Sequence, residues 1–110
     1  MSDLTRTDVI KLIAVATKPL NLRGVDLNGL DLNGLDLAGA NLSKTNLSKA
    51  NLIGANLSEA TIWNANLTNA NLSEANLTNA YLDRANLEGV IGYKQWLQRE
   101  RYKLRILRGN

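Results

Sequence analysis

The chain lacks several residue types on which common protein chemistries depend. Its 110 residues include no cysteine, no histidine and no phenylalanine. The absence of cysteine and histidine excludes disulfides, thiolate nucleophiles, Cys/His zinc sites and imidazole acid–base catalysis. Only five residues are aromatic, which is few for a conventional core of this size. The apolar content lies instead in leucine and alanine, and the length allows one small domain.

Long hydrophobic runs are also missing. No stretch approaches the ~18 uninterrupted apolar residues that a membrane span needs. The Ala-Val-Ala segment at 14–16 resembles a signal-peptide cleavage site, but the apolar run before it is short and is broken or flanked by Asp3, Asp8 and Lys11. We therefore expect a cytoplasmic protein.

What the chain does have is an internal repeat of five residues. Residues 20–89 divide into fourteen blocks without insertion or deletion, and the middle residue is leucine in every block except one, where it is Ile62. A helix would place successive leucines about 140° apart, and a straight strand would put alternate leucines on opposite faces. Both conflicts vanish if the chain turns a corner in each block, as the glycine at the fifth position of six blocks permits. The sequence therefore predicts an all-β solenoid with its leucines stacked inside.

The charges indicate how many blocks make one coil. With three blocks per coil, Glu59 would stack on Glu74 at about 4.8 Å, which is unfavourable for like charges. With four, Glu59 stacks on Asn79 and Lys44 stacks on Asn64, so no like charges coincide. This pattern favours four blocks per coil. Stacked asparagines, such as those at 41, 46 and 51, are then expected to form hydrogen-bonded ladders on the surface.

The blocks follow the pattern A-(N/D)-L-x-x, as in residues 40–44, and in this they resemble pentapeptide repeat proteins. The resemblance covers 70 of the 110 residues. It implies a right-handed quadrilateral β-helix of about three and a half coils, with one block on each side. The leucines from Leu22 to Leu87, with Ile62, would form the inward stack. Their small inward companions would be Ala40, Ala50, Ala55, Ala60, Ala65, Ala70, Ala75, Ala80 and Ala85.

The N-terminal end of the rod is expected to carry a cap. The first four blocks begin with large residues, Leu20, Val25, Leu30 and Leu35, which need cover at an open solenoid end. Residues 1–19 predict a capping helix from about Thr5 to about Thr17, ended by Pro19. Its apolar stripe consists of Val9, Ile10, Leu12, Ile13 and Ala16. A partner-binding helix is the alternative.

Residues 90–110 form a basic C-terminal segment with a net charge of +5, against −3 for the repeats and +1 for residues 1–19. Tyr93, Trp96 and Leu97 begin a rough helical pattern, so we expect a helical or irregular cap on the last coil. The same charges leave two alternatives open. The segment could bind nucleic acid or an anionic membrane, or it could dock an acidic partner or a second copy.

Catalysis is not expected. The carboxylates of the rod all lie at outward positions, and Asp26, Asp31 and Asp36 belong to consecutive sides of one coil, so they cannot converge on a metal ion. No nucleophile–base pair, P-loop or dinucleotide motif is present. We therefore expect no enzyme activity, no cofactor and no metal site.

Two outward aromatic residues suggest a binding surface. With four blocks per coil, Trp63 and Tyr81 lie on one side, one coil apart, and such residues are enriched in binding hot spots. The alternative is that the C-terminal segment folds back and covers them. The sequence thus predicts a non-catalytic protein-interaction or scaffold module, and electrostatic binding of nucleic acid or membrane is the alternative function. The candidate partner-binding residues are Trp63, Tyr81, Trp96, Arg99, Arg101, Lys103 and Arg105.

The resemblance also raises DNA mimicry. Some pentapeptide repeat proteins resemble duplex DNA in size and charge and inhibit or protect DNA gyrase, but those rods are longer and markedly acidic. This rod is short and carries −3 beside a +5 segment, which disfavours mimicry. The identity of the partner and the oligomeric state stay open.

Overall fold

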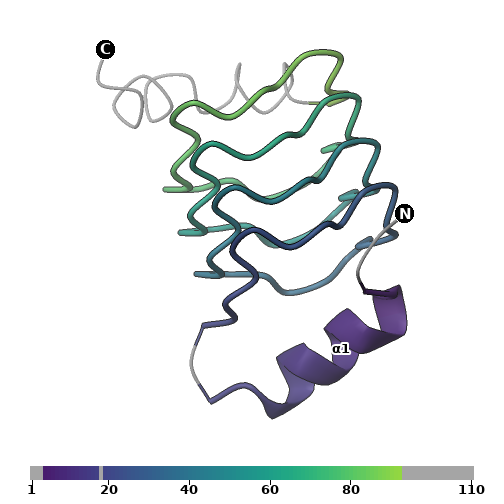
Figure 1. Cartoon of the computed structure of the whole chain (residues 1–110), viewed down its shortest axis with the longest axis vertical. Helices are drawn as coiled ribbons and strands as arrows, with labels where there is room; N and C mark the ends of the chain where they lie inside the picture. The colour runs from purple at the N-terminus through teal and green to yellow at the C-terminus, as the bar shows by residue number, and fades with distance from the viewer. Residues whose placement is uncertain (1–3, 18, 93–110) are drawn as a thin grey trace.

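The structure is a computed structural model that describes residues 4–17 and 19–92. A single α-helix, α1 (Arg6–Val15), lies across one end of a stack of coils (Figure 1). The expectations for residues 93–110, including a C-terminal cap and a tail folded over Trp63 and Tyr81, lie outside the described residues.

Parallel β-bridges join each coil to the next and set the coil size. They pair residues twenty positions apart, from Asn21 with Asn41 to Asn71 with Ile91. Four blocks therefore make one coil, as the charge pattern predicts. Leu32 N donates to Asn51 O at 2.8 Å, and Asn51 N donates to Leu30 O at 2.9 Å. Each side contributes isolated bridges rather than long strands, because the chain turns a corner in every block.

A tight turn makes each corner. In the first block Val25 N donates to Leu22 O at 3.1 Å, and Gly24 has a φ of +75°, which is the signature of a type II turn. Eight later blocks place a side chain other than glycine at this left-handed position, with φ between 59° and 62°. These residues are Lys44, Lys49, Glu59, Asn64, Asn69, Glu74, Asn79 and Arg84.

The residue before the central leucine closes a second small ring. Asn41 Oδ1 accepts a hydrogen bond from Ser43 N at 3.0 Å, and Asp31 Oδ1 does the same for Asn33 N. Twelve of the fourteen blocks contain this Asx turn. The prediction of asparagine ladders is therefore wrong for these oxygens: they are used within their own block, and backbone bonds join the coils.

The core is the predicted stack. The central residues from Leu22 to Leu82 are at most 4% exposed, and the inward alanines from Ala40 to Ala80 are at most 2% exposed. Leu87 and Ala85, at the end of the repeats, are half-buried. Thr45 takes one alanine position, and its buried hydroxyl donates to Leu42 O at 2.7 Å. This bond satisfies a polar group that would otherwise destabilise the core.

Helix α1 starts where the sequence predicts, with Thr5 as its N-cap. Asp8 N donates to Thr5 Oγ1 at 3.1 Å, and Thr5 N donates to Asp8 Oδ2 at 2.9 Å, which completes a capping box. The helix ends at Val15 instead of near Thr17, because Ala16 is already extended. Pro19 is therefore not the direct stop.

Only part of the predicted apolar stripe faces the rod. Val9 is buried, and Ile13 and Leu4 are half-buried against the core, as are the large first residues of the first four blocks. Ile10 and Leu12 are 42% and 37% exposed. A helix laid over the end of a coil touches it along a narrow line, so residues a quarter turn away stay in solvent.

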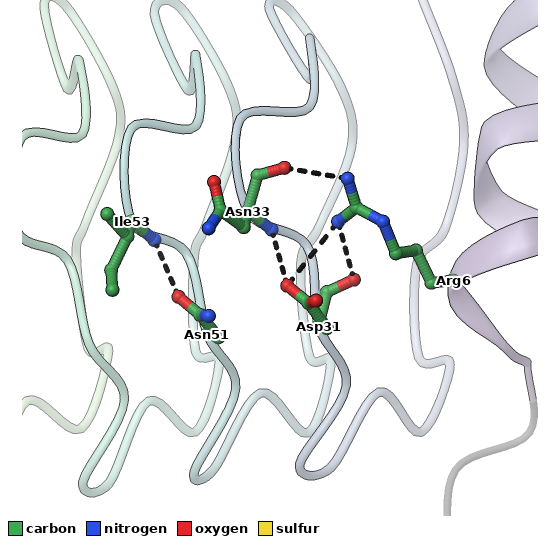
Figure 2. A network of polar contacts seen from close by, with 5 residues as sticks. All are labelled: Arg6, Asp31, Asn33, Asn51 and Ile53. Atoms are coloured by element: carbon green, nitrogen blue, oxygen red, sulfur yellow. Dashed lines mark hydrogen bonds and ion pairs between the residues drawn. The ribbon is translucent and has the colours of Figure 1, made fainter.

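Arg6 attaches α1 to the open edge of the first coil (Figure 2). Its guanidinium donates to Asp31 O and to Asn33 O, each at 3.0 Å, and Nη1 lies 3.4 Å from Asp31 Oδ1. Further along the rod, the equivalent carbonyls of Asn51 and Ile53 accept the backbone N–H groups of the preceding coil. Arg6 therefore takes the place of two donors from a coil that the rod does not have.

Candidate partner-binding site

Four stacked blocks form one side of the rod, which we call the aromatic side: residues 20–24, 40–44, 60–64 and 80–84. The twenty-residue register aligns equivalent positions along the rod. One column of this side consists of Asn21, Asn41, Thr61 and Tyr81, and a second consists of Arg23, Ser43, Trp63 and Asp83. Trp63 and Tyr81 thus belong to consecutive coils of the same side, as predicted.

Trp63 is half-buried, and a lysine of the preceding coil lies over its indole ring. Lys44 Nζ lies 5.3 Å from the ring centroid, within the range of a cation–π interaction. Ser43, which precedes Trp63 in the same column, is only 3% exposed, whereas Ser48, Ser58 and Ser73 at equivalent positions are half-buried. Trp63 and Arg23 flank Ser43 in this column, so the ring lies against the rod with one part in solvent.

Tyr81 is the more accessible of the pair, with 54% of its surface exposed. It stands where the repeat normally has asparagine, and Thr61 occupies the same position one coil earlier. Among the fourteen described blocks, 60–64 and 80–84 are the two without an Asx turn. The two blocks without an Asx turn are therefore the two that carry the outward aromatic residues, and both blocks lie on the aromatic side.

The charges of the rod are divided unequally among its sides. The aromatic side carries Arg23, Lys44 and Arg84 against Asp83, a net charge of +2. The other three sides of residues 20–89 together carry one cation, Lys49, against six carboxylates, a net charge of −5. Arg23, Lys44, Asp83 and Arg84 are all exposed. The aromatic side is thus a cationic strip on an otherwise acidic rod.

Two of the predicted partner-binding residues lie together in the structure, beside a lysine that was not predicted. Trp63 and Tyr81 share the aromatic side, but Trp96, Arg99, Arg101, Lys103 and Arg105 lie outside the described residues. Lys44 was not predicted to contact Trp63. The sequence contains the signal for this contact, because the fifth position of one block lies next to the fourth position of the block one coil later.

Other chemistry has little support in the described part of the chain. There, no three acidic side chains come together as they would around a metal ion. A small open hollow of about 160 Å³ lies between α1 and the rod, and Asp36 is its only ionisable lining residue, so it offers no acid–base pair. Of the helices in this part, none has the length and apolarity to cross a membrane.

Comparison with known proteins identifies the repeat. A sequence profile of pentapeptide repeats matches residues 21–58 and 55–91, in eight copies. The chain belongs to the pentapeptide repeat family. A search of curated proteins gives no match.

Several solved pentapeptide repeat structures are similar to the chain. One, from the Arabidopsis thaliana thylakoid lumen, is 26% identical with a TM-score of 0.68, covering 74% of this chain and 59% of its own. Another, from the cyanobacterium Cyanothece 51142, is 43% identical with a TM-score of 0.41, covering 64% and 52%. This pentapeptide repeat chain therefore spans little more than half the length of these two relatives. The Arabidopsis match supports the solenoid fold.

Proposed function

We propose that this pentapeptide repeat chain is a non-catalytic protein-interaction module and that the aromatic side is its contact surface. The observation that carries the proposal is the coincidence of Trp63 and Tyr81 with the two blocks that lack an Asx turn. A repeat optimised for stability alone would keep asparagine there, because the Asx turn satisfies a backbone N–H in the other twelve blocks. Departures from local structural rules are expected at functional sites.

The exposure of the pair supports the same proposal. A tyrosine with more than half of its surface in solvent contributes little to the core, but it offers a large rigid surface to a partner. Trp63 is held by Lys44 from the preceding coil, so less of its conformational freedom remains to be lost on binding.

Site-specific photo-crosslinking tests the proposal directly. Benzoylphenylalanine is placed at position 81 of the full chain in the organism that encodes it, and at Ser58 on another side as the matched control. We expect a discrete protein adduct from position 81 that is lost in Trp63→Ala, and no such adduct from position 58. Equal labelling from both positions would contradict a dedicated contact surface.

The charge of residues 90–110 favours a second candidate, electrostatic binding of nucleic acid or anionic membrane. This binding would fall steeply with salt and disappear when the chain is truncated after Gly92. Binding that survives both changes and is lost in Trp63→Ala would select the protein-interaction module. The right-handed winding of the solenoid and a cytoplasmic location stay predictions.

A further inference from the structure

We infer that the aromatic side docks an acidic segment of its protein partner, and this inference rests on the function proposed above. The distribution of charge along the rod favours this occupant. Three of the four cations in residues 20–89 lie on this one side, Arg23, Lys44 and Arg84, while the other sides repel anions. An acidic segment therefore meets a favourable potential over one strip of the rod and an unfavourable one elsewhere.

The cations are arranged along the aromatic side together with its two aromatic rings. Arg23, Lys44 and Arg84 belong to the first, second and fourth coils, so they are spread along the whole length of the side. With coils about 4.8 Å apart, Lys44 and Arg84 are separated along the rod by roughly 10 Å, about three residues of an extended peptide. Trp63 and Tyr81 occupy the coils between and beside them. The side therefore fits a short acidic segment that also carries apolar residues.

The charged groups of this side are open to a ligand. Lys44 lies over the Trp63 ring at 5.3 Å while remaining exposed, so its ammonium is held near one place and is open to a carboxylate. Arg23 and Arg84 are exposed and can each form two parallel hydrogen bonds with a carboxylate.

The same observations weigh against nucleic acid as the occupant of this side. A phosphate backbone is a continuous anion, and it would approach Asp83 on the side itself and the acidic sides adjoining it. A short acidic peptide can place its carboxylates opposite the three cations alone. Binding of DNA to the aromatic side is therefore an outcome that would overturn the inference.

Trp63 can report binding in the full chain. In a Trp96→Phe background Trp63 is the sole tryptophan, and its emission is recorded while a short peptide of Glu and Leu residues is titrated. The matching Lys–Leu peptide and a single-stranded oligothymidylate are titrated in parallel. We expect the acidic peptide to shift the emission with an affinity that falls as salt rises, and the other two probes to leave it unchanged.

Two triple variants separate the aromatic side from overall charge. The first triple removes three positive charges from the aromatic side and combines Arg23→Gln, Lys44→Gln and Arg84→Gln. The second triple lowers the net charge by the same amount on other sides and combines Lys49→Gln, Asn69→Asp and Asn79→Asp. We expect about tenfold weaker peptide binding in the first triple and less than about twofold change in the second. If the first triple folds poorly, Arg84→Gln is compared with Lys49→Gln instead, since each removes one positive charge and only the first is expected to weaken binding.

Two results would overturn the inference: equal weakening in both triples, or binding of the oligonucleotide in place of the peptide. A crosslink from position 81 that persists while the acidic peptide fails to bind would refute the acidic segment alone and leave the protein-interaction module standing. If neither the crosslink from position 81 nor binding of the acidic peptide is observed, both proposals are refuted.

Discussion

A central leucine and the asparagine before it have separate structural roles in each block. The leucine fills the interior of the coil, and the asparagine holds the turn through a hydrogen bond to the backbone two residues on. The two roles predict different costs of substitution, because one removes packed volume and the other removes a single hydrogen bond at the surface.

Leu52→Ala is predicted to lower the free energy of unfolding by about 2–5 kcal/mol, because Leu52 is fully buried in the stack. Ile53→Ala, the adjacent outward residue, is the matched control. It is half-buried, so its loss is expected to be less than half as large. Chemical denaturation measures both, and equal losses would show that the assignment of inside and outside is wrong.

Asp8 makes the capping of α1 depend on pH. The backbone N–H of Thr5 and then its hydroxyl lower the pKa of Asp8 below the ordinary value of 3.8. A lowered pKa in the folded state means that the contribution of Asp8 is complete above this ordinary value and is lost as the pH falls through the lowered one. Helicity measured by circular dichroism is therefore expected to decline in this acid range, and Asp8→Asn should remove that dependence. A decline of the same size in Asp8→Asn would assign it to another group.

At the scale of elements, Arg6 is the polar link between α1 and the rod in the described residues. Its ion pair with Asp31 is exposed and contributes little, but the two bonds to backbone carbonyls satisfy the open edge of the first coil. No short-range pattern predicts this link, since Arg6 lies 25 and 27 residues from its acceptors.

Arg6→Lys is predicted to destabilise the docked helix by about 1–2 kcal/mol, since one ammonium does not reproduce the paired donors of a guanidinium. Faster hydrogen exchange of the α1 amides and a lower unfolding midpoint are the expected signals. Arg23→Lys, at an exposed position with no such pair of carbonyls, should change neither. If the hydrogen exchange of the α1 amides is the same in Arg6→Lys as in the parent chain, apolar packing by Val9 and Ile13 alone holds the helix.

At the scale of the whole molecule, the period of five predicts most of the architecture. It sets the inward leucines and the corners, because one repeated local rule applies to every block, and the charge pattern adds the four blocks per coil. The exposed parts of α1, the buried hydroxyl of Thr45 and the contact between Lys44 and Trp63 depend on packing between segments distant in sequence or on single departures from the repeat. Of these features, the contact between Lys44 and Trp63 is the one that lies in the candidate site.

Tyr81→Asn is the sharpest test of whether Tyr81 serves binding at no benefit to the fold. This substitution restores the Asx turn of block 80–84, whereas Asn86→Tyr, one side along in the same coil, removes one. In chemical denaturation we predict that Tyr81→Asn keeps or raises the free energy of unfolding and that Asn86→Tyr lowers it by about 1 kcal/mol. A loss of more than about 1 kcal/mol in Tyr81→Asn would rule out this role, because it would show that the tyrosine stabilises the rod.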